Sequence, residues 1–199
     1  MRFTRLFSVV ISGMTALSLA TPAFAVLPAP FGWYVDGNLG ISKLSDDNYT
    51  GSTDSSGYGG SVDFGYKFMP YFTTELGYTR YANIDIKNSA GTKAAKVQND
   101  SLYLAGKGIV PVEGWGFELF GKLGIQRLNS RVTISDSAAA ASLGITSSRH
   151  KKTGLYVGAG GEYYFMPEVA VLVQWARSIG DNTTGTLDLY SIGLSLMLS

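Results

Sequence analysis

The sequence predicts an all-β protein, an eight-stranded antiparallel β-barrel that crosses a membrane. Apolar and polar side chains alternate with a period of two along eight segments, which is the pattern of strands with two different faces. Short proline turns and long polar connections also alternate between these segments, as they do in membrane barrels. Each apolar face runs for about ten residues, the length that a tilted strand needs to cross a bilayer.

Residues 1–25 are predicted to be a secretory signal peptide that is removed, leaving a barrel domain at 26–199. Arg2 and Arg5 precede an apolar run, and Ala23-Phe24-Ala25 is a small-residue cleavage site. Removing these two arginines from the 16 basic residues leaves 14 to face 15 acidic ones, so the net charge points to no polyanionic partner. The sequence has no cysteine, which excludes disulfides and thiolate sites.

The first four segments each have one apolar face. These faces are formed, segment by segment, by Trp33, Val35, Leu39 and Ile41; by Val62, Phe64, Tyr66 and Phe68; by Phe72, Thr74, Leu76 and Tyr78; and by Leu102, Leu104, Gly106 and Gly108. The residues between them are mostly polar or small, so each segment is predicted to be a strand with one side in lipid.

The last four segments repeat the pattern. Their apolar faces are formed by Phe117, Leu119, Gly121, Leu123 and Ile125; by Leu155, Val157, Ala159, Tyr163 and Phe165; by Val169, Val171, Val173 and Trp175; and by Tyr190, Ile192, Leu194, Leu196 and Leu198. Tight turns are predicted at Pro70, at 111–114 and at Pro167, and long polar loops at 45–56, 87–97, 130–151 and 178–185.

The polar faces are predicted to point into the barrel. A soluble barrel would instead place its apolar face inside and its polar face in water. The interior of an eight-stranded barrel has room only for side chains. The polar faces carry charges that would fill such an interior poorly unless they pair: Lys67, Glu75, Lys107, Glu118, Lys122 and Glu162.

Turn positions predict the partners of these charges. A turn centred near residue 71 places Lys67 opposite Glu75, and the same arithmetic around 111–114 places Lys107 opposite Glu118. Lys122 and Glu162 are then expected to meet across the lumen. The pairs either fill and register the barrel or form a gate for small ions, and the sequence leaves both interpretations open.

The whole mature chain resembles the small eight-stranded outer-membrane barrels of Gram-negative bacteria, the OmpA-like and OmpX-like superfamily, and three stretches carry the resemblance. They are GWYVDGNLGISKL, GYKFMPYFTTELGY and the ending SIGLSLMLS. The resemblance implies an outer-membrane protein with both chain ends in the periplasm and with lipid, lipopolysaccharide and the assembly machinery as partners. Nothing follows the eighth segment, so the peptidoglycan-binding domain of OmpA-type proteins is expected to be absent.

The resemblance also suggests an assembly signal in the last strand. Ser191, Gly193, Leu196 and Leu198 match its polar, small and apolar positions. The final aromatic residue of such signals is missing, because Leu198 and Ser199 end the chain.

Basic and aromatic residues lie where the apolar faces end. Lys43, Arg80, Arg127, Lys151 and Arg177 are expected to form an outer rim that contacts lipopolysaccharide phosphates or serves as a general interfacial anchor. Trp33, Trp115, Trp175 and Tyr190 are expected to form aromatic girdles at the membrane surfaces.

The sequence favours a non-enzymatic role, structural or adhesin-like, through the long loops. Arg149, His150, Lys151 and Lys152 form a cationic cluster that suits a sulfated glycan, or they belong to a solvated variable loop. A narrow pore is the alternative, and a lipid A-modifying enzyme is a remote one. Ser147 and Ser148 are only sequence neighbours of His150, and no carboxylate is placed to orient its imidazole. No cofactor, metal cluster or nucleic-acid partner is expected.

Overall fold

The computed structural model describes residues 31–44, 52–53, 56–87, 93–112, 115–142, 147–180 and 185–198. The predicted signal peptide and Ser199 lie outside these ranges. Eight long strands form the barrel: β1 (Gly32–Leu44), β3 (Ser56–Met69), β4 (Phe72–Arg80), β6 (Lys93–Val112), β7 (Phe117–Ile134), β8 (Ser148–Met166), β9 (Val169–Ser178) and β10 (Leu187–Leu198). Two short strands, β2 (Ser52–Thr53) and β5 (Ile84–Lys87), and the helix α2 (Ser137–Ser142) complete the described elements.

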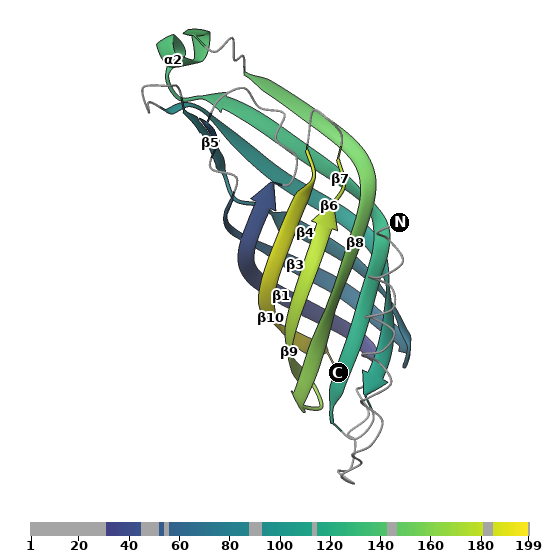
Figure 1. Cartoon of the computed structure of the whole chain (residues 1–199). Helices are drawn as coiled ribbons and strands as arrows, with labels where there is room; N and C mark the ends of the chain where they lie inside the picture. The colour runs from purple at the N-terminus through teal and green to yellow at the C-terminus, as the bar shows by residue number, and fades with distance from the viewer. Residues whose placement is uncertain are drawn as a thin grey trace, which may run out of the picture.

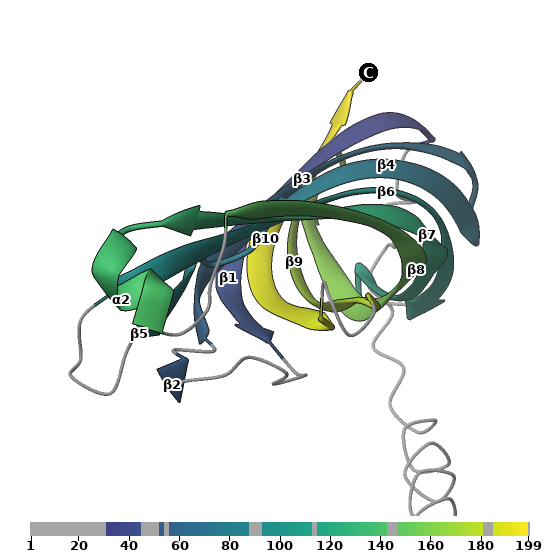
Figure 2. The same cartoon turned by 90° about the horizontal axis from the view of Figure 1, so that it is seen from above.

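The sheet closes on itself, which confirms the predicted fold. All pairings are antiparallel, and sequential barrel strands are neighbours. The first strand pairs with the last, from Trp33 opposite Leu198 to Leu44 opposite Leu187. Figures 1 and 2 show the tilted strands from the side and from above. In the described part of the chain, no helix is long and apolar enough to span a membrane.

Three strands reach beyond the rest of the barrel at the end opposite the short turns, which we call the loop end. β6, β7 and β8 have 20, 18 and 19 residues, whereas β9 has 10. Their outer parts form an extension that ends near α2, with β5 paired to the free edge of β6 and β2 paired to β5 (Figures 1 and 2). The predicted long loop 130–151 is therefore wrong in large part, because β7 continues to Ile134 and β8 begins at Ser148.

The burial pattern inverts along the strands. Through most of the barrel, apolar side chains face outward and are exposed, such as Leu39 at 75% and Leu123 at 62%. At the loop end, apolar side chains turn inward and form one buried cluster, which we call the apolar plug: Leu44, Tyr81, Ile84, Ile86, Ala95, Val97, Leu128, Leu187 and Leu189. On β10, for example, Tyr190 faces outward at 55% exposure, whereas Leu189 and Leu187 are buried. The sequence analysis placed apolar faces outside only and did not anticipate the plug.

Candidate functional site

The six predicted lumen residues all lie inside the barrel, between 0% and 7% exposed. Asp36 and Asp63, which sequence reasoning did not single out, lie there too, and six of these eight residues form three like-charged pairs on neighbouring strands. Asp36 lies opposite Asp63, Lys107 opposite Lys122, and Glu118 opposite Glu162. Like charges in directly opposite positions destabilise a sheet. Their compensation has to come from across the lumen.

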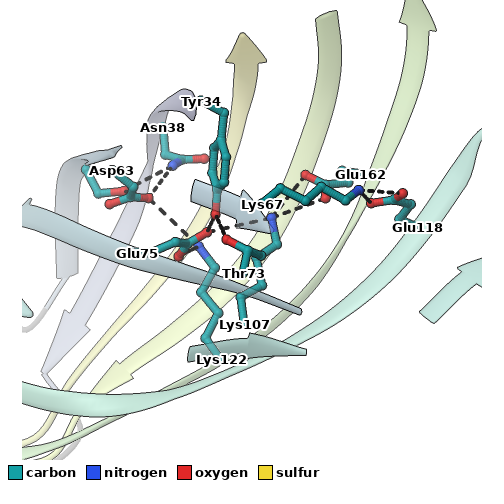
Figure 3. A network of polar contacts seen from close by, with 11 residues as sticks. Tyr34, Asn38, Asp63, Lys67, Thr73, Glu75, Lys107, Glu118, Lys122 and Glu162 are labelled. Carbon is teal, nitrogen blue, oxygen red and sulfur yellow. Dashed lines mark hydrogen bonds and ion pairs between the residues drawn. The ribbon is translucent and has the colours of Figure 1, made fainter. Parts of the chain in front are cut away.

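The lysines reach across the interior to carboxylates on other strands (Figure 3). Lys67 Nζ donates to both oxygens of Glu118 at 2.9 Å. Lys122 Nζ lies 2.8 Å from Glu75 Oε2 and 3.9 Å from Asp63 Oδ2. Lys107 Nζ lies 3.2 Å from Glu162 Oε1 and 3.7 Å from Glu75 Oε1. Glu75, on β4, therefore sits between two lysines that come from the next two strands, β6 and β7.

Neutral side chains supply further hydrogen bonds in the network. The Tyr34 hydroxyl donates to Glu75 Oε1 at 2.6 Å and lies 2.8 Å from Thr73 Oγ1. Asn38 Nδ2 donates to Asp63 Oδ2 at 3.2 Å. Gly65 lies under the Tyr34 ring, and a Cβ there would overlap the ring atoms. This close approach lets Tyr34 lie across the inner wall toward Glu75.

The predicted partner assignments were wrong. Lys67 lies opposite Thr73, not Glu75, because the strands turn tightly at 70–71 and a register shift lies between Lys67 and Met69. Lys107 lies opposite Lys122, because the second turn begins after Val112, farther along the chain than predicted. Lys122 contacts Glu75 and Asp63, and Glu162 contacts Lys107 instead. An offset of a few residues at a turn was enough to change every pair.

The interior is filled on both sides of this network. At the turn end, the space bounded by Tyr34, Lys107 and Glu162 is too narrow to hold a water molecule. Toward the loop end, the rings of Tyr103 and Tyr156 stack with centroids 3.8 Å apart. The apolar plug follows beyond them.

The predicted rim residues are divided between different surroundings. Asp188, on the outer side of β10, lies opposite Lys43 on β1 and Arg177 on β9. Arg177 donates to both Asp188 oxygens, from Nε at 2.7 Å and from Nη2 at 2.9 Å. Trp175 Nε1 also donates to Asp188, at 2.9 Å. Arg80 lies opposite a different carboxylate, Asp100.

The other two rim residues, Arg127 and Lys151, belong to a cationic surface on the extension. Arg131 lies directly opposite Arg149, and Lys151 is opposite Asn129, between Arg131 and Arg127. Strand alternation places all four cations on the outer side of β7 and β8, and all four are exposed. We call these four residues, Arg127, Arg131, Arg149 and Lys151, the basic face.

The predicted cluster 149–152 is split by this geometry. His150 and Lys152 alternate with Arg149 and Lys151 along β8 and so point to the opposite side of the sheet. Arg131 was missed because the sequence analysis ended the fifth strand too early. Continuing the same alternation past Arg127 would have found it.

The predicted girdle residues lie toward both ends of the outer surface. Trp33, near the turn end, stacks on Phe64 with centroids 4.9 Å apart and contacts Tyr66 at 4.8 Å. Trp175 and Tyr190 are paired neighbours nearer the loop end, and Trp115 lies in an exposed turn. In the last strand, Leu196 and Leu198 face outward, whereas Ser191 is buried. No group of three or more His, Cys, Asp or Glu in the described ranges is arranged to hold a metal.

Comparison with known proteins shows the family to which this barrel belongs. A family model described as the outer membrane protein beta-barrel domain matches residues 11–199. The chain belongs to this family. Outer membrane protein A of Escherichia fergusonii is 30% identical over 196 residues, covering 90% of this chain and 53% of the relative. Outer membrane protein A of Klebsiella pneumoniae is 30% identical over 180 residues, covering 82% and 50%. The chain thus spans about half the length of these relatives, and its location is the bacterial outer membrane.

Solved structures of outer-membrane barrels share the fold. OprG of Pseudomonas aeruginosa has a TM-score of 0.65 at 14% identity, covering 87% of this chain and 99% of OprG. Neisserial surface protein A has a TM-score of 0.63 at 19% identity, covering 84% and 97%. Ail of Yersinia pestis has a TM-score of 0.57 at 16% identity, covering 85% and 100%. At these identities the similarity concerns the fold alone.

Proposed function

We propose that this outer-membrane barrel is a non-enzymatic surface-binding protein whose basic face takes anionic carbohydrate. Short turns of such barrels lie in the periplasm and the longer connections outside the cell, so the loop end faces outward. The proposed ligand class is a sugar that carries sulfate or phosphate groups. The observation that carries the proposal is the grouping of the four exposed cations on two paired strands.

The electrostatic repulsion between the cations of the basic face supports a binding role. Arg131 and Arg149 occupy directly opposite positions, where like charges are unfavourable. Arginine forms two parallel hydrogen bonds with phosphate or sulfate oxygens, which relieves that repulsion. From Arg127 to Arg131 the strand rises about 13 Å, enough for more than one anionic group of an extended ligand.

The filled interior supports placing the function on the outside. Ion pairs occupy the membrane-spanning half of the lumen, and the Tyr103–Tyr156 stack and the apolar plug occupy the half beyond it. An eight-stranded barrel packed in this way favours a structural core over a pore. One solved neighbour bears on the ligand class: Ail of Yersinia pestis was crystallised with the heparin analogue sucrose octasulfate, at a TM-score of 0.56 and 16% identity to this chain.

The test is the binding of sucrose octasulfate to the folded barrel, measured by titration calorimetry. We expect Arg131→Gln with Arg149→Gln to weaken binding by roughly tenfold or more, because two charge-assisted contacts are lost. Arg80→Gln is the matched control, an outward arginine outside the basic face, and should bind like the wild type. Equal affinity in the double variant and the wild type would contradict the proposal.

The natural source of the anionic sugar is decided by competition. The phosphorylated core oligosaccharide of lipopolysaccharide and a heparin oligosaccharide are each titrated against bound sucrose octasulfate. Displacement by the core alone assigns the basic face to the cell's own envelope, whereas displacement by heparin alone assigns it to a foreign surface. Displacement by neither, despite a normal fold, would show that neither the lipopolysaccharide core nor heparin is the natural ligand of the basic face.

A further inference from the structure

The outer surface of the barrel has a hollow of ≈ 510 Å³ along β8, between β7 and β9. Its floor is formed by Ala159 and Gly161, whose small outward faces lie among the larger side chains of Leu119, Val173 and Trp175. Leu119 on β7 and Val173 on β9 lie on either side of Gly161, so they form the walls. Trp175, opposite Ala159, stands at the end of the hollow nearer the cell exterior.

A cationic cap follows directly beyond this end. Arg177 is the next outward residue after Trp175 on β9, about 7 Å farther along the strand. Its guanidinium lies over the Trp175 ring, with 5.4 Å between Cζ and the centroid. Trp175 and Asp188 therefore hold Arg177 in a fixed position above the hollow.

The cap has cationic donors to offer to an anion. A guanidinium carries five N–H groups. Arg177 directs Nε–H and one N–H of Nη2 to Asp188, which leaves the N–H groups of Nη1 for a ligand. Lys43 lies on the other side of Asp188 and is exposed. Two cations thus flank one carboxylate, and the cap is net positive.

We propose that the hollow seats one acyl chain of a lipid A molecule, with a phosphate of that lipid at Arg177 and Lys43. The hollow lies in the apolar band that faces the bilayer, and its charged end lies at the outer-leaflet surface. A groove with a cation at the headgroup level matches the chemistry of an anionic lipid. This site is separate from the basic face and does not depend on it.

A concave site of small residues also fits other occupants. Close contacts at small residues hold membrane segments together, so a second copy of the chain is the main competitor. The cationic cap favours the lipid, because a second copy would have to bring an anionic group of its own to the same level. An anionic phospholipid offers the same chemistry as lipid A but is not the occupant that we propose.

The test measures lipid retention by native mass spectrometry of the folded barrel in mild detergent. Lipid A and phosphatidylglycerol are added separately. Ala159→Leu fills the hollow from the lipid side, and Thr74→Leu is the control, since it adds the same kind of side chain to the outer face of β4. We expect wild type and Thr74→Leu to retain one lipid A, and Ala159→Leu to bind it about fivefold more weakly or worse.

A second variant tests the cap without breaking the Arg177–Asp188 contact. Lys43→Gln should weaken lipid A binding severalfold, whereas Lys96→Gln, at a lysine in the outer part of β6, should leave it unchanged. Folding of every variant is checked by its mobility shift between unboiled and boiled gel samples. If Ala159→Leu does not fold, Ala159→Val serves in its place, and Lys43→Gln tests the charged end independently.

Three results would overturn the proposal. Wild-type affinity in both Ala159→Leu and Lys43→Gln would show that the hollow holds no lipid. If the wild type retains phosphatidylglycerol as well as it retains lipid A, and the same variants lose both, the occupant would be an anionic lipid in general and not lipid A. A wild-type dimer that Ala159→Leu converts to a monomer, without bound lipid, would assign the hollow to a contact between copies. None of these results bears on the binding of sucrose octasulfate to the basic face.

Discussion

Glu75 is the residue on which the interior network depends most. It contacts Lys122, Lys107 and Tyr34, which come from three different strands. Asp36 differs from Glu75 in its partners. It is also completely buried, but it lies opposite Asp63, and neither of its carboxylate oxygens accepts a hydrogen bond. Removing one partner of a buried ion pair costs more than the pair contributes, because the remaining charge stays uncompensated.

The two carboxylates should therefore respond in opposite ways to the same conservative change. Glu75→Gln should lower the free energy of unfolding by about 3 kcal/mol, since Lys122 and Lys107 lose a shared partner. Asp36→Asn should leave stability unchanged or raise it, because it removes a charge next to Asp63. Urea unfolding in lipid vesicles measures both, and a larger loss for Asp36→Asn than for Glu75→Gln would contradict the contacts described.

The extension of β6, β7 and β8 is built like a small soluble domain at the end of a membrane barrel. Its inner side carries Val97 and Leu128, both in the apolar plug, and its outer side carries Arg131 and Arg149. Inside the bilayer the same strands have the reverse arrangement. The outward side chains change from apolar to charged between Tyr190 and Asp188 on β10 and between Ile125 and Arg127 on β7. We interpret this change as the level at which the membrane ends and water begins.

The plug should hold the extension closed. Leu128→Ser removes a large buried side chain and places a hydroxyl among apolar groups, at a cost of about 3 kcal/mol. We expect local opening of the extension to become roughly a hundredfold more frequent, with faster cleavage by proteinase K added to intact cells. Arg131→Ser is the control, on the same strand but exposed. Equal cleavage of the two variants would show that the plug does not stabilise the extension.

The fold of the whole molecule could be predicted because two periodic signals agree. Alternation along each strand and the alternation of short and long connections lead to the same closed barrel. The ion pairs could not be predicted in the same way, because Lys67 finds Glu118 across the lumen, and a small shift at a turn changes every partner. The plug was missed because Leu187 and Leu189 reverse a pattern that the rest of β10 follows.

The basic face could not be predicted from the sequence either, because it is formed by two paired strands. Arg131 and Arg149 lie 18 positions apart in the sequence and become neighbours only through the pairing of β7 with β8. In the sequence, the run 149–152 looks like one cationic loop. In the folded chain it divides between two sides of a sheet, and only one side joins Arg127 and Arg131.

Planar-bilayer conductance of the folded barrel tests most directly whether the interior is a packed core and the function lies outside it. We expect a silent membrane for the wild type and equally for Glu118→Ala, with folding confirmed by the gel mobility shift, because the aromatic stack and the plug remain in place. Steady, reproducible channels that change in Glu118→Ala would contradict this expectation and make the Lys67–Glu118 pair a gate.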